Sequence, residues 1–166
     1  LKDQPYCRSK VLRLQDIELE LNEYIKKDLQ TRCLNINAFR KSGYELTQGA
    51  LEIKTKVGDD STLIEANLPI TISRGEQTAK ESQYSILIKL PLGRLYSASR
   101  DIVNAEALSG TFDTVPYSLI KTQITGLPYI IQKQQPYPDK LYILKLKDTP
   151  QDKAYIFQFF IEGEPR

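Results

Sequence analysis

The 166-residue chain has no histidine, no tryptophan, no methionine and only two cysteines, Cys7 and Cys33. Imidazole and thiolate groups perform most of the hydrolytic and acid–base chemistry that enzymes use near neutral pH. Their scarcity removes the commonest catalytic sites, including nucleophiles that are activated by histidine. The sequence therefore favours a binding or structural role over catalysis, and it predicts no cofactor.

Long apolar runs and an excess of charge of one sign are also missing. With 23 Lys+Arg against 21 Asp+Glu, the formal net charge is +2, and the charges are spread along the chain. No basic footprint for nucleic acid or anionic lipid is therefore predicted. The apolar runs are too short to span a membrane, and no segment resembles a signal peptide.

The chain begins at Leu1 and contains no methionine. We expect it to be cut from a longer protein, and the favoured interpretation is an ectodomain without its N-terminal membrane helix. An arbitrary boundary or a processed secreted form would fit the same observation. The expected location is extracellular or at the cell surface, with a membrane reached only through a helix upstream of Leu1.

The two cysteines allow a single disulfide between Cys7 and Cys33. Such a bridge would imply an oxidising compartment. The alternative is that Cys33 is a small buried apolar side chain on a helix and that Cys7 is a reduced thiol near the terminus. With no CxxC pair and no histidine, two cysteines cannot complete a tetrahedral zinc site, so no metal site is predicted.

A long amphipathic helix is predicted from Asp16, a good N-cap, to about Gly43. Residues 1–15 are expected to form an extended segment before it. Acidic residues gather near the start of the helix and basic residues near its end, which suits the helix dipole. Cys33 is expected inside this helix, on its buried face. The apolar stripe consists of Ile17, Leu21, Ile25, Leu29, Cys33, Ile36 and Phe39.

Short runs of alternating apolar and polar residues follow Gly43 and predict an antiparallel meander. The runs cover residues 44–48, 50–57, 63–67, 70–73 and 84–90. Residues 58–61 and 74–76 are expected to form turns, because Gly, Asp and Ser tolerate tight backbone conformations. Asp59 and Asp60 lack the alternating ligands of a calcium loop, so they are interpreted as turn residues.

A second helix is predicted from about Arg94 to Leu108, with Gly110 as its cap. Its serines lack the GxSxG and SxxK contexts of serine nucleophiles. Four strands are then predicted over residues 117–121, 129–133, 141–147 and 154–162, the last two forming a hairpin. The inward aromatic and aliphatic residues of this hairpin are expected to form core.

A polar, proline-interrupted loop separates two of these strands. Its candidate partner-binding residues are Gln134, Gln135, Tyr137 and Asp139, because exposed aromatics on loops often mediate recognition. A solvated connection without function is the alternative. Taken together, the elements predict one α+β domain over residues 16–166, in which a long N-terminal helix and a second mid-chain helix pack on a largely antiparallel sheet.

Several of these features resemble those of uncharacterised archaeal cell-envelope proteins. The resemblance covers about residues 16–162 and implies a pilin-like membrane helix ahead of an extracellular α+β domain. It carries over no catalytic residue. The motifs are the cysteine-bearing helix from Leu21 to Phe39, Ser42-Gly43-Tyr44, Leu68-Pro69-Ile70-Thr71-Ile72, Leu92-Gly93-Arg94-Leu95-Tyr96 at the start of a helix, and Tyr155-Ile156-Phe157-Gln158-Phe159.

Three functions remain open from the sequence. The favoured one is a noncatalytic envelope ectodomain that binds a protein or surface polymer or builds surface structure, as a single chain or as a homo-oligomer. The second is a filament or sheath subunit that assembles through exposed strand edges such as residues 141–147. The third is a hydrolase that uses two carboxylates, since such enzymes need no histidine.

Overall fold

The computed structural model describes residues 12–33, 43–148 and 153–163. The described residues divide into an N-terminal unit, residues 12–92, and a C-terminal unit from residue 93 onward. The α+β class is confirmed, with helices packed against two antiparallel sheets. A single domain over residues 16–166 stays a prediction. Residues 1–11 of the predicted extended segment lie outside the described residues.

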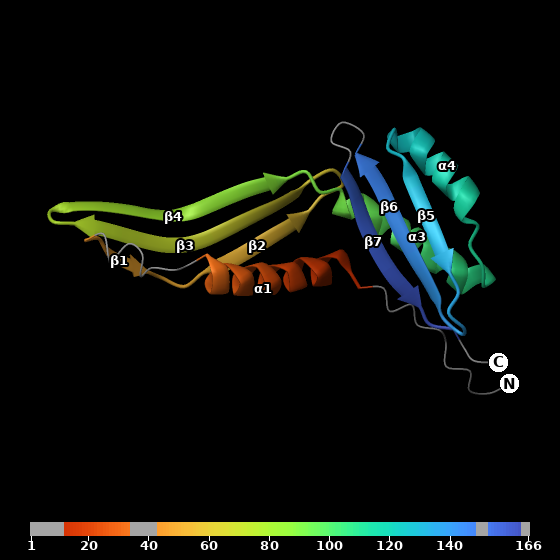
Figure 1. Cartoon of the computed structure of the whole chain (residues 1–166), viewed down its shortest axis with the longest axis horizontal. Helices are drawn as coiled ribbons and strands as arrows, with labels where there is room; N and C mark the ends of the chain where they lie inside the picture. Colours follow the sequence, from red (N-terminus) through yellow and green to blue (C-terminus); the bar gives the residue numbers. More distant parts are fainter. Residues whose placement is uncertain (1–11, 34–42, 149–152, 164–166) are drawn as a thin grey trace. The chain divides into compact units, whose positions relative to one another are not determined.

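Among the described residues, the N-terminal unit contains one helix and one sheet, and the C-terminal unit contains two helices and one sheet (Figure 1). The N-terminal unit contains α1 (Leu14–Arg32), β1 (Glu45–Gln48), β2 (Glu52–Val57), β3 (Thr62–Arg74) and β4 (Gln77–Ile88). The C-terminal unit contains α3 (Leu92–Ser109), α4 (Thr114–Thr125), β5 (Tyr129–Gln134), β6 (Lys140–Asp148) and β7 (Lys153–Ile161).

The first helix begins slightly earlier and ends sooner than predicted. Asp16 is not the N-cap, because Oδ2 of Asp16 accepts a 3.0 Å hydrogen bond from the backbone N–H of Arg13, which precedes the helix. At the other end, Cys33 caps the helix through its N–H to the carbonyl of Leu29 and is exposed. The predicted burial of Cys33 is therefore wrong, because the helix ends at Arg32 and Cys33 is its exposed C-cap. Residues 34–42 lie outside the described residues.

The sheet of the N-terminal unit is built around β3. β2 pairs with residues 62–67 of β3, β1 pairs with residues 70–73, and β4 pairs with β3 over its length, all antiparallel. The strands predicted over 63–67 and 70–73 are thus one strand, whose register shifts between Asn67 and Ile70. Pro69, which has no N–H to donate, lies within this irregularity. The predicted turns after β2 and β3 are confirmed.

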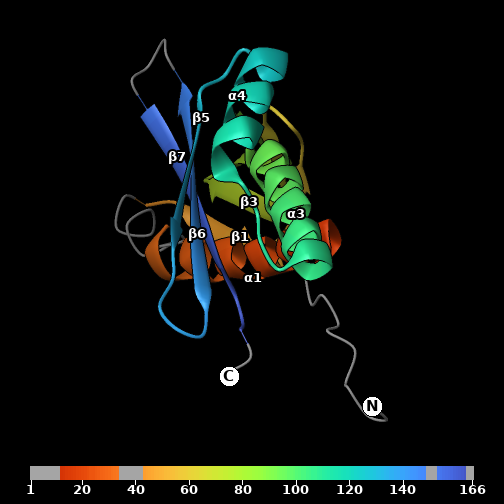
Figure 2. The same ribbon diagram turned by 90° about the vertical axis from the view of Figure 1, so that its right-hand side faces the viewer.

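The sheet of the C-terminal unit has the order β5-β6-β7, and the predicted hairpin of the last two strands is confirmed. β6 is its central strand, so residues 141–147 are not the exposed edge that the sequence suggested. Figure 2 shows α3 and α4 on one face of this sheet. The predicted mid-chain helix is confirmed as α3, and Gly110 follows it with φ 70°.

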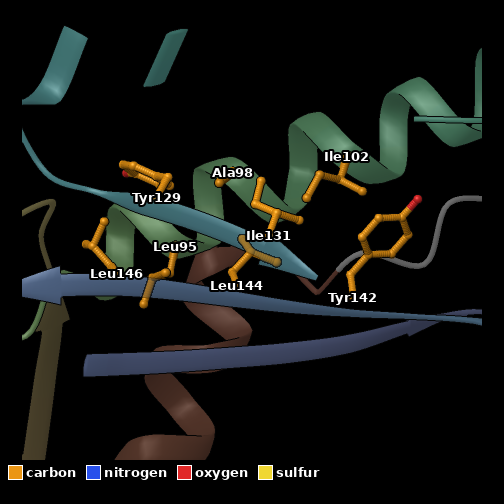
Figure 3. Packing of buried hydrophobic residues seen from close by; sticks show 8 residues of the cluster. All are labelled: Leu95, Ala98, Ile102, Tyr129, Ile131, Tyr142, Leu144 and Leu146. Carbon is orange, nitrogen blue, oxygen red and sulfur yellow. The ribbon is translucent and has the colours of Figure 1, made fainter. Parts of the chain in front are cut away.

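The core of the C-terminal unit lies between α3 and the inner face of this sheet (Figure 3). The alternation of β5 and β6 points every second side chain toward the helix. Partly buried aromatics of β7 pack against this core, as predicted. The buried cluster consists of Leu95, Ala98 and Ile102 from α3, Tyr129 and Ile131 from β5, and Tyr142, Leu144 and Leu146 from β6.

The strand predicted over residues 117–121 is wrong, because this segment belongs to helix α4. Its capping residues explain the difference. Asp113 is the N-cap and accepts a hydrogen bond from the N–H of Val115, while Gly126 ends the helix in a left-handed conformation, φ 69°. Pro116 falls in the first turn, where a helix needs no N–H from it. These caps outweigh the short alternation that suggested a strand.

Candidate interaction surface

One edge of the N-terminal sheet is covered by helix α1. Oδ1 of Asn22 accepts a 2.7 Å hydrogen bond from the backbone N–H of Thr55, and Oε1 of Glu18 accepts a 2.9 Å bond from that of Val57. Glu18 and Asn22 lie four residues apart and therefore on one face of the helix. The outward N–H groups of Thr55 and Val57 are thus bonded within the unit, which protects this edge from pairing with another chain.

The opposite edge belongs to β4 (Figure 1), and the alternation of the backbone identifies its outward groups. The backbone N–H of Val57 points away from β3. The backbone groups of the preceding residue, Lys56, therefore point toward β3 and bond to those of Leu63. The next residue, Ile64, then bonds toward β4 through its partner Ile86. The backbone groups that point outward from β4 are those of Gln83, Ser85 and Leu87.

Every residue of β4 is exposed, over a length of 12 residues. Proteins usually protect an edge strand by keeping it short, by charges, by proline or by a bulge in it. The segment from Gln83 to Ile88 has none of these features, since its sequence is QYSILI. Among the described residues, no strand pairs with this outer edge. It is therefore a template for an added strand.

An apolar row lies beside this edge on one face of the sheet. It consists of Tyr84, Ile86 and Ile88, whose residues are 44%, 57% and 40% exposed. Their partners on β3, including Ile64, are intermediate or buried. On this face of the sheet, the residues of β4 are thus more exposed than their partners on β3. A strand added to β4 would place its own alternate side chains against this row.

The loop predicted to bind a partner connects β5 to β6. Gln134 is the last residue of β5, and Gln134 and Gln135 are exposed, as is Tyr137 at 73%. Asp139 has a local structural contact, because its Oδ1 accepts a 3.1 Å hydrogen bond from the N–H of Gly163. The four residues therefore share one hairpin connection, and a binding role for it stays a prediction.

A buried ionic cluster, which the sequence analysis missed, lies at the C-terminal end of α3. The Glu106 side chain is 2% exposed. Its Oε1 accepts hydrogen bonds from Lys133 Nζ, at 2.9 Å, and from the Tyr142 hydroxyl, and its Oε2 accepts one from Lys140. Lys140 Nζ also donates a 2.7 Å bond to the carbonyl of Gly110.

The environment keeps Glu106 ionised. Burial by itself raises the pKa of Glu106, but the hydrogen bonds from Lys140, Tyr142 and Lys133 outweigh it, so the pKa lies below its ordinary value. Burial and the bond to Glu106 raise the pKa of Tyr142. A carboxylate held charged, covered and bonded to three side chains fastens α3 to β5 and β6. We assign it a structural role.

The sequence contained signals for both the buried ionic cluster and the open edge of β4. Glu106 lies four residues after Ile102 on the buried face of α3, and Lys133 lies two residues after Ile131 on the inner face of β5. An acid and two bases at inward positions are typical of a buried ionic cluster. The open edge of β4 had a weaker signal, because pairing between strands decides which strand lies at an edge.

The disulfide between Cys7 and Cys33 stays a prediction, because Cys7 lies outside the described residues. In the described part of the chain, no group of three or more acidic, histidine or cysteine residues is arranged to hold a metal ion. No helix within those same residues has both the length and the apolar character required to cross a membrane.

Comparison with known protein families, with curated proteins and with solved structures found no match to this chain. The similarity to archaeal cell-envelope proteins therefore stays a prediction from the sequence motifs.

Proposed function

We propose that this chain is a noncatalytic binding module of an extracellular or cell-surface protein, and that it binds a protein partner by strand addition to β4. The observation that carries the proposal is the outer edge of β4, with 12 exposed residues and an uncharged segment at Gln83–Ile88. An exposed strand edge with an uncharged, largely apolar segment is prone to aggregate or to pair with a partner.

Strand addition uses two kinds of contact that β4 offers. The outward N–H and C=O groups of Gln83, Ser85 and Leu87 would bond to the main chain of the partner, which provides affinity for any extended segment. The apolar row of Tyr84, Ile86 and Ile88 would select alternate apolar side chains on one face of that segment. The partner is therefore an extended peptide segment with apolar residues at every second position.

The noncatalytic character and the location rest on the sequence. The absence of histidine removes the usual acid–base groups. The predicted disulfide between Cys7 and Cys33 supports an oxidising compartment, and the resemblance to envelope proteins supports display at a cell surface.

Assembly into a filament is the second candidate function. β7 is an edge strand of its own sheet, and its outward residues Ile156 and Phe160 are each 62% exposed. A chain with an open edge on each of two sheets can join unlike edges head to tail, which gives an open polymer. This arrangement would use the same β4 edge with a different partner strand.

The proposal is tested with a displayed library of random peptides and the Ser85→Pro variant. Proline at residue 85 removes an outward N–H of β4, and edge strands accept proline where the N–H faces solvent. We expect peptides selected on the unmodified chain to have alternating apolar residues. Their affinity for Ser85→Pro should be at least about tenfold lower, because a main-chain hydrogen bond is lost and the proline ring blocks the edge.

A control variant separates strand addition from adhesion to any apolar surface. Leu19 is 62% exposed and belongs to α1, the helix that covers the edge opposite β4, so Leu19→Lys should leave peptide binding unchanged. Circular dichroism should show the same fold for both variants. If the selected peptides bind Ser85→Pro as tightly as the unmodified chain, strand addition at β4 is wrong.

A further inference from the structure

We infer that the strand added to β4 is β4 of a second copy of this chain, in antiparallel pairing about a two-fold axis at Ser85. This inference rests on the proposed function and specifies its partner. It follows from the order of residues along the exposed edge, which in this register pairs apolar residues with each other and opposite charges with each other.

Two of the three residues of the apolar row pair with each other in this register. With Ser85 opposite its own copy, Tyr84 lies opposite Ile86 of the second copy, and the two-fold axis repeats that pair. Gln83 lies opposite Leu87 on the other face. Pairs of an aromatic with a β-branched residue are among the favourable cross-strand contacts of antiparallel sheets. Both members of the pair are exposed in a single copy, so pairing removes apolar surface from water.

The charges agree with the same register. Glu81 lies in β4, and Lys89 follows it directly. In the pairing about Ser85, Glu81 of one copy lies opposite Lys89 of the other, and the axis repeats this pair as well. The segment between them carries no charge. Opposite charges across a strand pair are favourable, while like charges directly opposite are unfavourable.

Neighbouring registers lose the charge pair. If the axis moves to Tyr84, Glu81 lies opposite Leu87. If it moves to Ile86, the apolar row still pairs with itself, with Tyr84 opposite Ile88, but Glu81 lies opposite Pro91. Because the contact uses the same strand on both copies, it is isologous and closes at two chains. The expected product is therefore a dimer with a continuous sheet through both β4 strands, and not an open polymer.

Sedimentation of the full chain over a range of concentrations tests the dimer. We expect a monomer–dimer equilibrium for the unmodified chain. Ile86→Lys should raise the dissociation constant at least about tenfold, because each lysine then lies opposite Tyr84 of the other copy and the apolar pair is lost at two symmetric positions. Leu19→Lys, which makes the same change at a comparably exposed leucine, should leave the equilibrium unchanged.

Exchange of the two charges tests the register. Glu81→Lys should weaken the dimer by about tenfold, because it places lysine opposite Lys89 at two symmetric positions. Combining Glu81→Lys with Lys89→Glu should restore the original dissociation constant. Adhesion between unspecific apolar surfaces gives no such restoration.

The outcomes separate this inference from the proposed function. A chain that stays monomeric at all concentrations, or that forms an open polymer, overturns the two-fold dimer. So does a double variant that fails to recover the dimer lost in Glu81→Lys. If alternating peptides still distinguish the unmodified chain from Ser85→Pro while the chain is monomeric, strand addition holds and only the second copy as partner is wrong.

Discussion

The two units differ in how far they bury their own apolar side chains. In the C-terminal unit, α3 and the sheet enclose a contiguous cluster of eight buried residues. Among the described residues of the N-terminal unit, the buried apolar side chains are Leu46, Leu51, Leu68 and Pro91, and one whole strand is exposed. The first arrangement is typical of a unit that buries its own apolar face, and the second of a unit that completes its sheet with a partner.

Buried polar groups show the same difference. In the C-terminal unit, the carboxylate of Glu106 is bonded to three side chains. In the N-terminal unit, the hydroxyl of Thr55 is buried and has no hydrogen-bond partner among the described residues. The C-terminal unit therefore has the features of a rigid scaffold. In its described residues, the N-terminal unit has this buried hydroxyl without a partner, and backbone groups along the outer edge of β4 that pair with no other strand.

The same substitution in the two units should have very different effects. Leu144→Ala removes a fully buried side chain from the core of the C-terminal unit, and we expect a loss of about 3 kcal/mol in its free energy of unfolding. Leu87→Ala on β4 changes a leucine that is 64% exposed, so its cost should be about 0.5 kcal/mol or less.

Amide hydrogen exchange, followed separately in β6 and in β3, measures these two values for each unit. A loss at Leu87→Ala equal to that at Leu144→Ala would contradict the description of β4 as an exposed strand. Measurement at low protein concentration keeps the proposed dimer from contributing to the result.

Removal of the buried carboxylate should have the next largest effect. Glu106→Gln leaves Lys133 and Lys140 without a negative partner, and we expect it to cost about 2 kcal/mol, below the usual range for a broken buried pair because both lysines retain some contact with water. Chemical denaturation at neutral pH measures this cost. Glu162→Gln, which changes a carboxylate that is exposed, is the control.

The pH dependence of this stability has a defined sign. Because the pKa of Glu106 is lowered by folding, its contribution is present above the ordinary pKa of a glutamate and is lost as the pH falls through the lowered value. Glu106→Gln should therefore flatten the decrease in stability at acidic pH. A variant that loses stability in acid as steeply as the unmodified chain would show that Glu106 is not the group responsible.

Much of the fold could be predicted because local patterns determine it. The alternation of Tyr142, Leu144 and Leu146 placed these residues in the core correctly, and the glycine at residue 75 marked the turn between β3 and β4. The segment 117–121 was assigned wrongly because its alternation is short, while the deciding residues, Asp113 and Gly126, lie outside it. A longer window that includes capping residues finds this helix.

The candidate surface was harder to predict than the fold. The inward and outward faces of β4 follow from its own sequence, but its place at the edge depends on where β1 and β2 pair with β3. The same limit explains the error at residues 141–147, which look like an edge strand and lie between two neighbours. Strand order depends on contacts between distant residues, which periodicity does not report.

One expected effect has the opposite sign to the others. Thr55→Val replaces the buried hydroxyl that has no partner, so we expect it to stabilise the N-terminal unit by about 1 kcal/mol. Thr62→Val is a matched control, because Thr62 is equally buried but its hydroxyl donates a 3.4 Å hydrogen bond to the carbonyl of Leu90. That substitution should destabilise by about 1 kcal/mol, since it leaves a carbonyl without its donor. Both variants keep β-branching and nearly the same shape, so the difference between their unfolding free energies reports the hydrogen bond. Equal effects at the two threonines would show that the Thr55 hydroxyl is satisfied in solution, and the contrast drawn between the interiors of the two units would be lost.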